Sequence, residues 1–216
     1  MTTFLTVFAD LYRQFVLDIQ HTSWLEFIAV ITGILSVWFS RQENIWVYPT
    51  GLVNTILYIW LSYRSSLLGE ASVNLYYTVV SIYGWVLWAR KDDRQQHLLR
   101  ITRSSRRERL VQLGFFGICY APVYFALTYL KKDFAPQAIP WADAFASATA
   151  YTGMWLMAKK KVESWHWWIA TNFSSIPLYF VKHYVFTSVY YVILLMMAVS
   201  GLLEWSKKAK QTRYAA

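Results

Sequence analysis

The sequence predicts an all-α integral membrane protein in which seven transmembrane helices form two parallel three-helix bundles joined by one linking helix, a 3+1+3 repeat. Seven apolar, aromatic-rich stretches follow one another with almost no charge inside them. Hydrophobic residues make up 56% of the 216 residues and charged residues only 15%. A soluble domain of this size needs polar faces on most of its helices, so this composition favours a chain embedded in lipid.

The first element, residues 1–22, carries apolar side chains at helical spacing, interrupted by Asp10, Arg13 and Asp18. We expect an amphipathic helix that lies on the membrane surface. The alternative, an eighth span, would place three charges in lipid and would move the amino terminus to the cytoplasm. The segment has neither a basic leading region nor a small-residue cleavage site, so it does not resemble a secretory signal.

The remaining elements follow from the apolar stretches, since about 17 to 25 residues cross a bilayer as a helix. The first bundle is expected at 23–89, with spans at 24–39, 45–63 and 71–89. A basic loop at 90–109 precedes the linking helix at 110–131. The second bundle is expected at 140–206, with spans at 141–158, 165–181 and 184–205, and 207–216 is expected to be a tail.

The basic residues give this topology a direction. If the loop after the third span is cytoplasmic, sixteen Lys and Arg residues fall on the cytoplasmic side and five on the other. Positive residues are concentrated on the cytoplasmic side of membrane proteins, so we expect the amino terminus outside and the carboxyl terminus in the cytoplasm. Topology thus explains the net charge of +9, and no nucleic-acid partner is expected; the partners expected are membrane lipid and a small-molecule substrate.

The two bundles resemble each other weakly in sequence. Because one linking helix inverts the chain once, the first and fifth spans start on the same side, and the repeats are parallel. In transporters such repeats enclose a path that opens to either side of the membrane. The matched pairs are Trp24 and Glu26 with Trp141 and Asp143, Trp46 and Asn54 with Trp165 and Asn172, and Gly84 and Trp88 with Gly201 and Trp205.

Polar and aromatic side chains form stripes on several of the predicted helices, and these stripes converge if the bundles face each other. An unpartnered amide in hydrocarbon costs several kcal/mol, so we expect the Asn side chains to face the interior or a cavity. Hydrogen bonding between helices is the alternative role for each Asn. The candidate substrate-binding residues are Trp46, Thr50, Asn54 and Tyr58 in the second span, Asn74 and Tyr77 in the third, Trp165, Trp168, Asn172, Ser175 and Tyr179 in the sixth, and Tyr191 in the seventh.

Motifs typical of catalysis are missing from the sequence. It has no Walker A loop, no paired His at metal-ligand spacing and no Gly-x-Ser-x-Gly. We therefore expect neither an enzyme nor a cofactor or metal. No ionisable residue lies in the middle of a span, whereas coupling to protons normally needs buried ionisable groups. An uncoupled facilitator is expected.

Two segments carry a family resemblance. SLLGEASVNLYYTVVSIYGWVLW at 66–88 resembles the third span of the PnuC family of nicotinamide riboside transporters. The second half resembles the same family in its Trp-x-Asp-Ala, Trp-x-x-Ala-Lys-Lys, Ser-x-x-Leu-Tyr and Gly-x-x-Glu-Trp motifs within 141–205. The resemblance implies a SWEET-like fold, a homotrimer and a place in the bacterial inner membrane. It also implies that unphosphorylated nicotinamide riboside passes down its gradient and is trapped by cytoplasmic phosphorylation.

The family's motifs fall on several of the candidate residues. Trp165, Asn172, Ser175 and Tyr179 match the sixth-span motif, where many members have Asp in place of Asn172. Gly51, Asn54, Leu57 and Tyr58 match the second-span motif, and Asn74 and Tyr77 the third. Trp and Tyr faces attract a cationic ring, and Asn amides suit ribose hydroxyls. Thiamine or riboflavin as substrate, a non-transporting receptor and a membrane enzyme stay open as alternatives.

Overall fold

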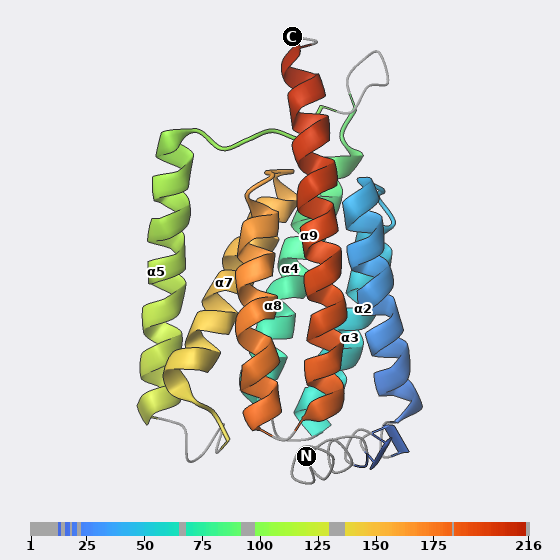
Figure 1. Ribbon diagram of the computed structural model, residues 1–216, viewed down its shortest axis with the longest axis vertical. Helices are drawn as coiled ribbons and strands as arrows, with labels where there is room; N and C mark the ends of the chain where they lie inside the picture. Colours follow the sequence, from blue (N-terminus) through green and yellow to red (C-terminus); the bar gives the residue numbers. More distant parts are fainter. Residues whose placement is uncertain are drawn as a thin grey trace, which may run out of the picture.

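The computed structural model describes residues 13, 16–17, 19–20, 23–64, 68–91, 98–129, 137–182 and 184–214. Within these ranges the chain forms seven helices (Figure 1), so the prediction of an all-helical protein is confirmed. Most of residues 1–22, where the sequence predicts an amphipathic helix, lie outside the described part. The helices are α2 (Trp24–Gln42), α3 (Val47–Arg64), α4 (Leu68–Ala89), α5 (Arg106–Tyr129), α7 (Pro140–Ala158), α8 (Ser164–Val181) and α9 (Val185–Tyr214).

Each helix coincides with one predicted span, but two boundaries differ. Helix α9 continues to Tyr214 and includes most of the predicted tail, because 206–214 contains good helix formers and no Gly or Pro. Helix α5 begins at Arg106, within the predicted basic loop. Part of that loop is also held in place, since Thr102 N donates to Lys160 O at 3.1 Å and Val162 N to Thr102 O at 3.0 Å.

Local signals set the helix ends. The Ser23 hydroxyl caps α2 by accepting a hydrogen bond from Glu26 N at 3.2 Å. Helix α2 ends at Gln42, and the left-handed backbone of the next residue, Glu43, lets its N–H reach back to the carbonyls of the last turn. Helix α7 begins with Pro140, whose fixed φ suits a first turn. There the Asp143 carboxylate accepts from Ile139 N at 2.6 Å.

The helices that pack against each other form a closed ring. Helix α2 packs against α3, α3 against α4, α4 against α7, α7 against α8, α8 against α9, and α9 against α2. Helix α5 lies beside the ring and packs against α7 (Figure 1). Two stacked ring pairs attach it, Phe115 on Trp155 at 4.8 Å and Phe116 on Trp167 at 5.4 Å.

The outside of the bundle is apolar. Three helices are long and apolar enough to cross a membrane by themselves: α2, α5 and the Val185–Gln211 part of α9. Large apolar side chains such as Ile118, Phe173 and Leu203 are exposed in the middle of their helices. Such a surface is unfavourable in water and natural in lipid.

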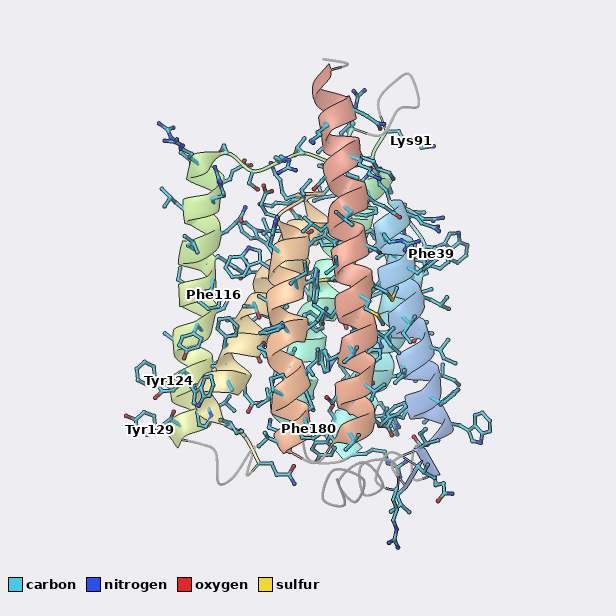
Figure 2. The ribbon with its side chains drawn as sticks, viewed as in Figure 1. Phe39, Lys91, Phe116, Tyr124, Tyr129 and Phe180 are labelled. Carbon is cyan, nitrogen blue, oxygen red and sulfur yellow. The ribbon has the colours of Figure 1, made fainter. Side chains whose placement is uncertain are left out.

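The two ends of the bundle differ. The basic end carries Arg41, Lys91, Lys160, Lys161 and Lys208. Figure 2 shows Lys91 and Phe39 toward this end and Tyr129 and Phe180 toward the opposite end. Near the basic end, burial and the neighbouring Lys161 lower the pKa of Lys159.

Candidate functional site

An aromatic cluster joins the two bundles inside the ring. From α4, Tyr77 lies 6.3 Å from the ring of Tyr151 in α7 and 6.3 Å from the ring of Trp168 in α8. Tyr76 meets Tyr151 edge to face at 4.6 Å, and its hydroxyl donates to the Tyr151 carbonyl at 3.0 Å. A second cluster follows along α8 and α9, where Tyr179 stacks on Tyr191 at 5.2 Å.

Gly153 sets the position of Trp168. A methyl group on Gly153 would lie 3.3 Å from three atoms of the Trp168 indole, so this ring packs directly against the backbone of α7. The opposite bundle approaches closely at Gly33, where a methyl group would lie 2.6 Å from the Tyr190 hydroxyl and 2.8 Å from Asn54 Nδ2. Small residues thus bring polar and aromatic groups from both bundles into one interior.

Among the described residues of α8, the Trp165 indole nitrogen is buried without a partner, and two further polar side chains on this helix are buried without hydrogen bonds. Asn172 is 3% exposed and Ser175 is 1% exposed. In the part of the chain that the structure describes, neither side chain makes a hydrogen bond. Nearly all buried polar side chains in proteins have partners, so these two groups are available to a ligand. They share a helix face with Trp168 and Tyr179, as the spacing predicts.

Other candidate residues use their polar groups within the fold. Asn54 Nδ2 donates to the Ala29 carbonyl of α2 at 2.6 Å, which is the helix-to-helix role that the sequence left open. The Thr50 hydroxyl donates to the Trp46 carbonyl one turn earlier at 2.7 Å. Asn74 and Tyr58 are partly buried and have partners of their own.

Two candidate Trp residues lie outside this interior cluster. Trp46 is 58% exposed, at the start of α3. Trp165 is completely enclosed near the basic end, two turns from Asn172, where it meets Trp205 edge to face at 5.5 Å. Neither ring belongs to the surface formed by Trp168, Asn172 and Ser175.

Sequence reasoning missed Tyr151 and Tyr190. Tyr151 follows 146–150, a run of Ala, Ser and Thr that allows close helix packing, and this run was the available signal. Tyr190 precedes Tyr191 and gave no separate signal, because adjacent residues on a helix point to different faces.

Comparison with known proteins shows which family the chain belongs to. A model of the family described as nicotinamide mononucleotide transporters matches residues 23–207. The chain belongs to this family. It is a bacterial membrane transporter and not an enzyme, and the resemblance noted in the sequence is confirmed.

Relatives and a solved structure cover nearly the whole chain. The nicotinamide riboside transporter PnuC of Escherichia coli (strain K12) is 24% identical, covering 88% of this chain and 87% of its own. The riboflavin/roseoflavin transporter RibM of Streptomyces davaonensis is also 24% identical, covering 92% of each. The crystal structure of the vitamin B3 transporter PnuC superposes with a TM-score of 0.72 at 26% identity, covering 93% of this chain and 88% of that chain.

Proposed function

We propose that the protein imports nicotinamide riboside by facilitated diffusion through the interior of the six-helix ring. The observation that carries the proposal is the buried, unpartnered pair Asn172 and Ser175 beside Trp168. The riboside has a cationic aromatic ring that suits the faces of Trp168 and Tyr77, and ribose hydroxyls that suit an amide and a hydroxyl. Relatives that are nicotinamide riboside transporters add support.

The unphosphorylated riboside fits this interior better than its 5′-phosphate. A phosphate would need a free Lys or Arg in the interior. The deeply buried cation among the described residues, Lys160, already pairs with Glu43 at 2.8 Å. We infer that the riboside enters down its gradient and is trapped by phosphorylation in the cytoplasm.

We infer a 3+1+3 parallel repeat, SWEET-like in its arrangement, with α2–α4 and α7–α9 as the bundles and α5 as the linking helix. Two equivalent contacts support the repeat. Tyr48 and Trp88 meet edge to face at 5.2 Å and 88°, and Trp165 and Trp205 at 5.5 Å and 89°. A methyl group on Gly84 would overlap Tyr48, and one on Gly201 would overlap Trp165. The equivalent of Trp165 is therefore Tyr48 rather than Trp46. Bundles related in this way support alternating access.

We propose that all seven helices cross the bacterial inner membrane, with the amino terminus outside, the basic end in the cytoplasm and residues 1–22 as an amphipathic helix on the surface. Exposed apolar residues on the helices other than α2, α5 and α9 support seven spans, among them Ile56, Val79 and Phe173. A homotrimer is also proposed, on the family resemblance. Helix α5, outside the ring, leaves Leu113 and Ile118 exposed toward lipid or a neighbouring subunit.

Another aromatic vitamin is the second candidate. The match to a riboflavin/roseoflavin transporter covers as much of the chain as the matches to the riboside transporters. Riboflavin and thiamine would also stack on Trp168 and Tyr77. A receptor that binds without transporting is a third candidate.

Calorimetry on detergent-purified protein tests the proposal, with nicotinamide riboside, its 5′-phosphate, thiamine and riboflavin as ligands. We expect heat of binding with the riboside alone. Binding of riboflavin or thiamine instead would mean that the protein carries that vitamin. Binding of the 5′-phosphate would contradict the inference that the interior has no free Lys or Arg to pair with a phosphate. Uptake of radiolabelled riboside into liposomes separates transport from a receptor, since a receptor would bind without uptake.

A further inference from the structure

The basic end of the bundle is sealed by tryptophan side chains from both halves of the chain. Trp88 of α4 and Trp205 of α9 are almost completely buried, and their rings lie 6.0 Å apart across the two bundles. The indole of Trp205 donates to the carbonyls of Ser40 and Arg41 in α2, at 3.1 Å each. The indole of Trp88 donates to the carbonyl of Ala158 in α7 at 3.2 Å. Each ring is thus held by the opposite bundle.

An ion pair between the bundles lies directly on this seal. Glu43 follows the first helix of its bundle, Lys160 follows the first helix of the other, and both have left-handed backbones, with φ of 65° and 50°. Lys160 Nζ lies 2.8 Å from Glu43 Oε1 and 4.6 Å from the centre of the Trp88 ring. Lys160 is only 3% exposed. Lys208 adds a second cation, 3.3 Å from Glu43 Oε2.

At the opposite end, the described contacts are of a different kind. The ion pair there, Lys182 with Asp143 at 2.6 Å, joins α7 and α8 within one bundle. An open cavity of about 340 Å³ is lined by Gln137, Ile139, Val181 and Lys182. In Figure 1, α2 leans away from α9 toward this end. The structure therefore has the bundles tied together at the basic end.

We propose that the Glu43–Lys160 pair is the latch of a gate at the basic end, and that the structure is the state in which this gate is closed. The inference rests on the proposed alternating access. Lys160 and Glu43 come from opposite bundles, so the pair must break when the bundles separate there. A buried ion pair loses hydration when it forms, and both charges regain water when the gate opens. The latch therefore holds the closed state without making opening prohibitive.

A reversible cross-link across the gate tests this proposal. The Ser40 hydroxyl lies 2.9 Å from the sulfur of Met157, one residue from each bundle. We would replace Cys119 with Ser, introduce Ser40→Cys with Met157→Cys, and bridge the pair with a short bis-thiosulfonate reagent that a reductant removes. Riboside uptake into liposomes should be lost on bridging and should return on reduction. Full bridging with unchanged uptake would overturn the proposal.

A matched pair of cysteines controls for the cross-link itself. Thr55 and Thr78 hydroxyls lie 2.9 Å apart, but α3 and α4 belong to the same bundle. Bridging Thr55→Cys with Thr78→Cys should leave uptake unchanged. Calorimetry on the Ser40–Met157 bridged protein should still show binding, which separates a failed gate from a wrong substrate.

Charge variants test the latch directly. In detergent-purified Cys119→Ser protein with Ser40→Cys, the new thiol lies at a position that is buried in the closed state. Lys160→Met should raise the rate of its modification by a maleimide about tenfold, because the open state gains population. Lys161→Met is the control, since Lys161 pairs with Glu108 at the edge of the bundle.

The exchanged pair, Glu43→Lys with Lys160→Glu, provides the rescue in a Lys208→Met background, because Lys208 would otherwise repel the lysine introduced at position 43. It restores opposite charges at the same two positions and should return the modification rate toward that of the parent. Equal rates in Lys160→Met, Lys161→Met and the parent would overturn the latch. A fast rate in the exchanged pair, with its ligand binding intact, would also overturn it, because the attraction between the two charges would then not hold the gate.

Discussion

Replacing Asn172 with Leu should weaken substrate binding without weakening the fold. The Asn172 side chain is buried and makes no hydrogen bond within the described part of the chain. Its loss removes a hydrogen bond to the ligand worth about 1–3 kcal/mol, or about 5- to 150-fold in Kd. The ligand-free fold loses no hydrogen bond, and Leu is more easily buried than an amide. The free energy of unfolding should therefore stay the same or rise by about 1–2 kcal/mol.

Calorimetry and thermal unfolding in the same detergent measure the two effects separately. Asn54→Leu is the contrasting variant, because its amide donates to the Ala29 carbonyl at 2.6 Å. That change should lower the free energy of unfolding by about 0.5–1.5 kcal/mol. If Asn172→Leu instead lowers thermal stability and leaves Kd unchanged, Asn172 holds helices together and the proposed site is wrong.

Further changes test the ring surfaces. Trp168→Ala should raise the Kd for the riboside by about 2- to 30-fold, through loss of about 0.5–2 kcal/mol of cation–π attraction, and Trp168→Phe should raise it less. Equal Kd values by calorimetry would exclude this ring from the site. Gly153→Ala should weaken binding because its methyl group displaces Trp168. Gly114→Ala is the control and should leave binding unchanged, because a methyl group at Gly114 would lie in open space. Gly201→Ala should lower the midpoint of thermal unfolding relative to Gly114→Ala, because its methyl group would lie 2.6 Å from the enclosed Trp165 ring. Equal midpoints would contradict the close packing of Trp165 against Gly201.

The sequence allowed the helices to be predicted well, but not the faces that point inward. Charge-free apolar windows define where helices lie, and all seven coincide with predicted spans. In lipid, however, inward and outward residues are both apolar, so polarity does not distinguish them. Trp46 and Tyr48 show the difficulty, because the first is exposed and the second is 2% exposed.

The candidate site was predicted in part for a related reason. Asn54 and Asn172 are the same residue type at similar depths, and only the structure shows that Asn54 reaches the backbone of α2. Tyr151 contacts rings on α4, and the Tyr190 hydroxyl lies close to Gly33 of α2. Spacing along one helix cannot reveal such contacts. Lys160 lies in a run of three Lys, a pattern that predicts a turn exposed to solvent. In the structure its backbone is left-handed, and its ammonium group is buried against Glu43.

The pair of opposite charges at the gate bears on how such a protein could arise. Glu43 and Lys160 occupy corresponding places in the two proposed repeats, after the first helix of each. A symmetric dimer of one half-length chain would have the same residue at both places, and like charges would then meet near the twofold axis. Attraction at this point requires two copies that differ. After duplication and fusion of an ancestral half, sequence divergence could therefore place an attractive ion pair at the gate, which a homodimeric ancestor could not have had at these two positions.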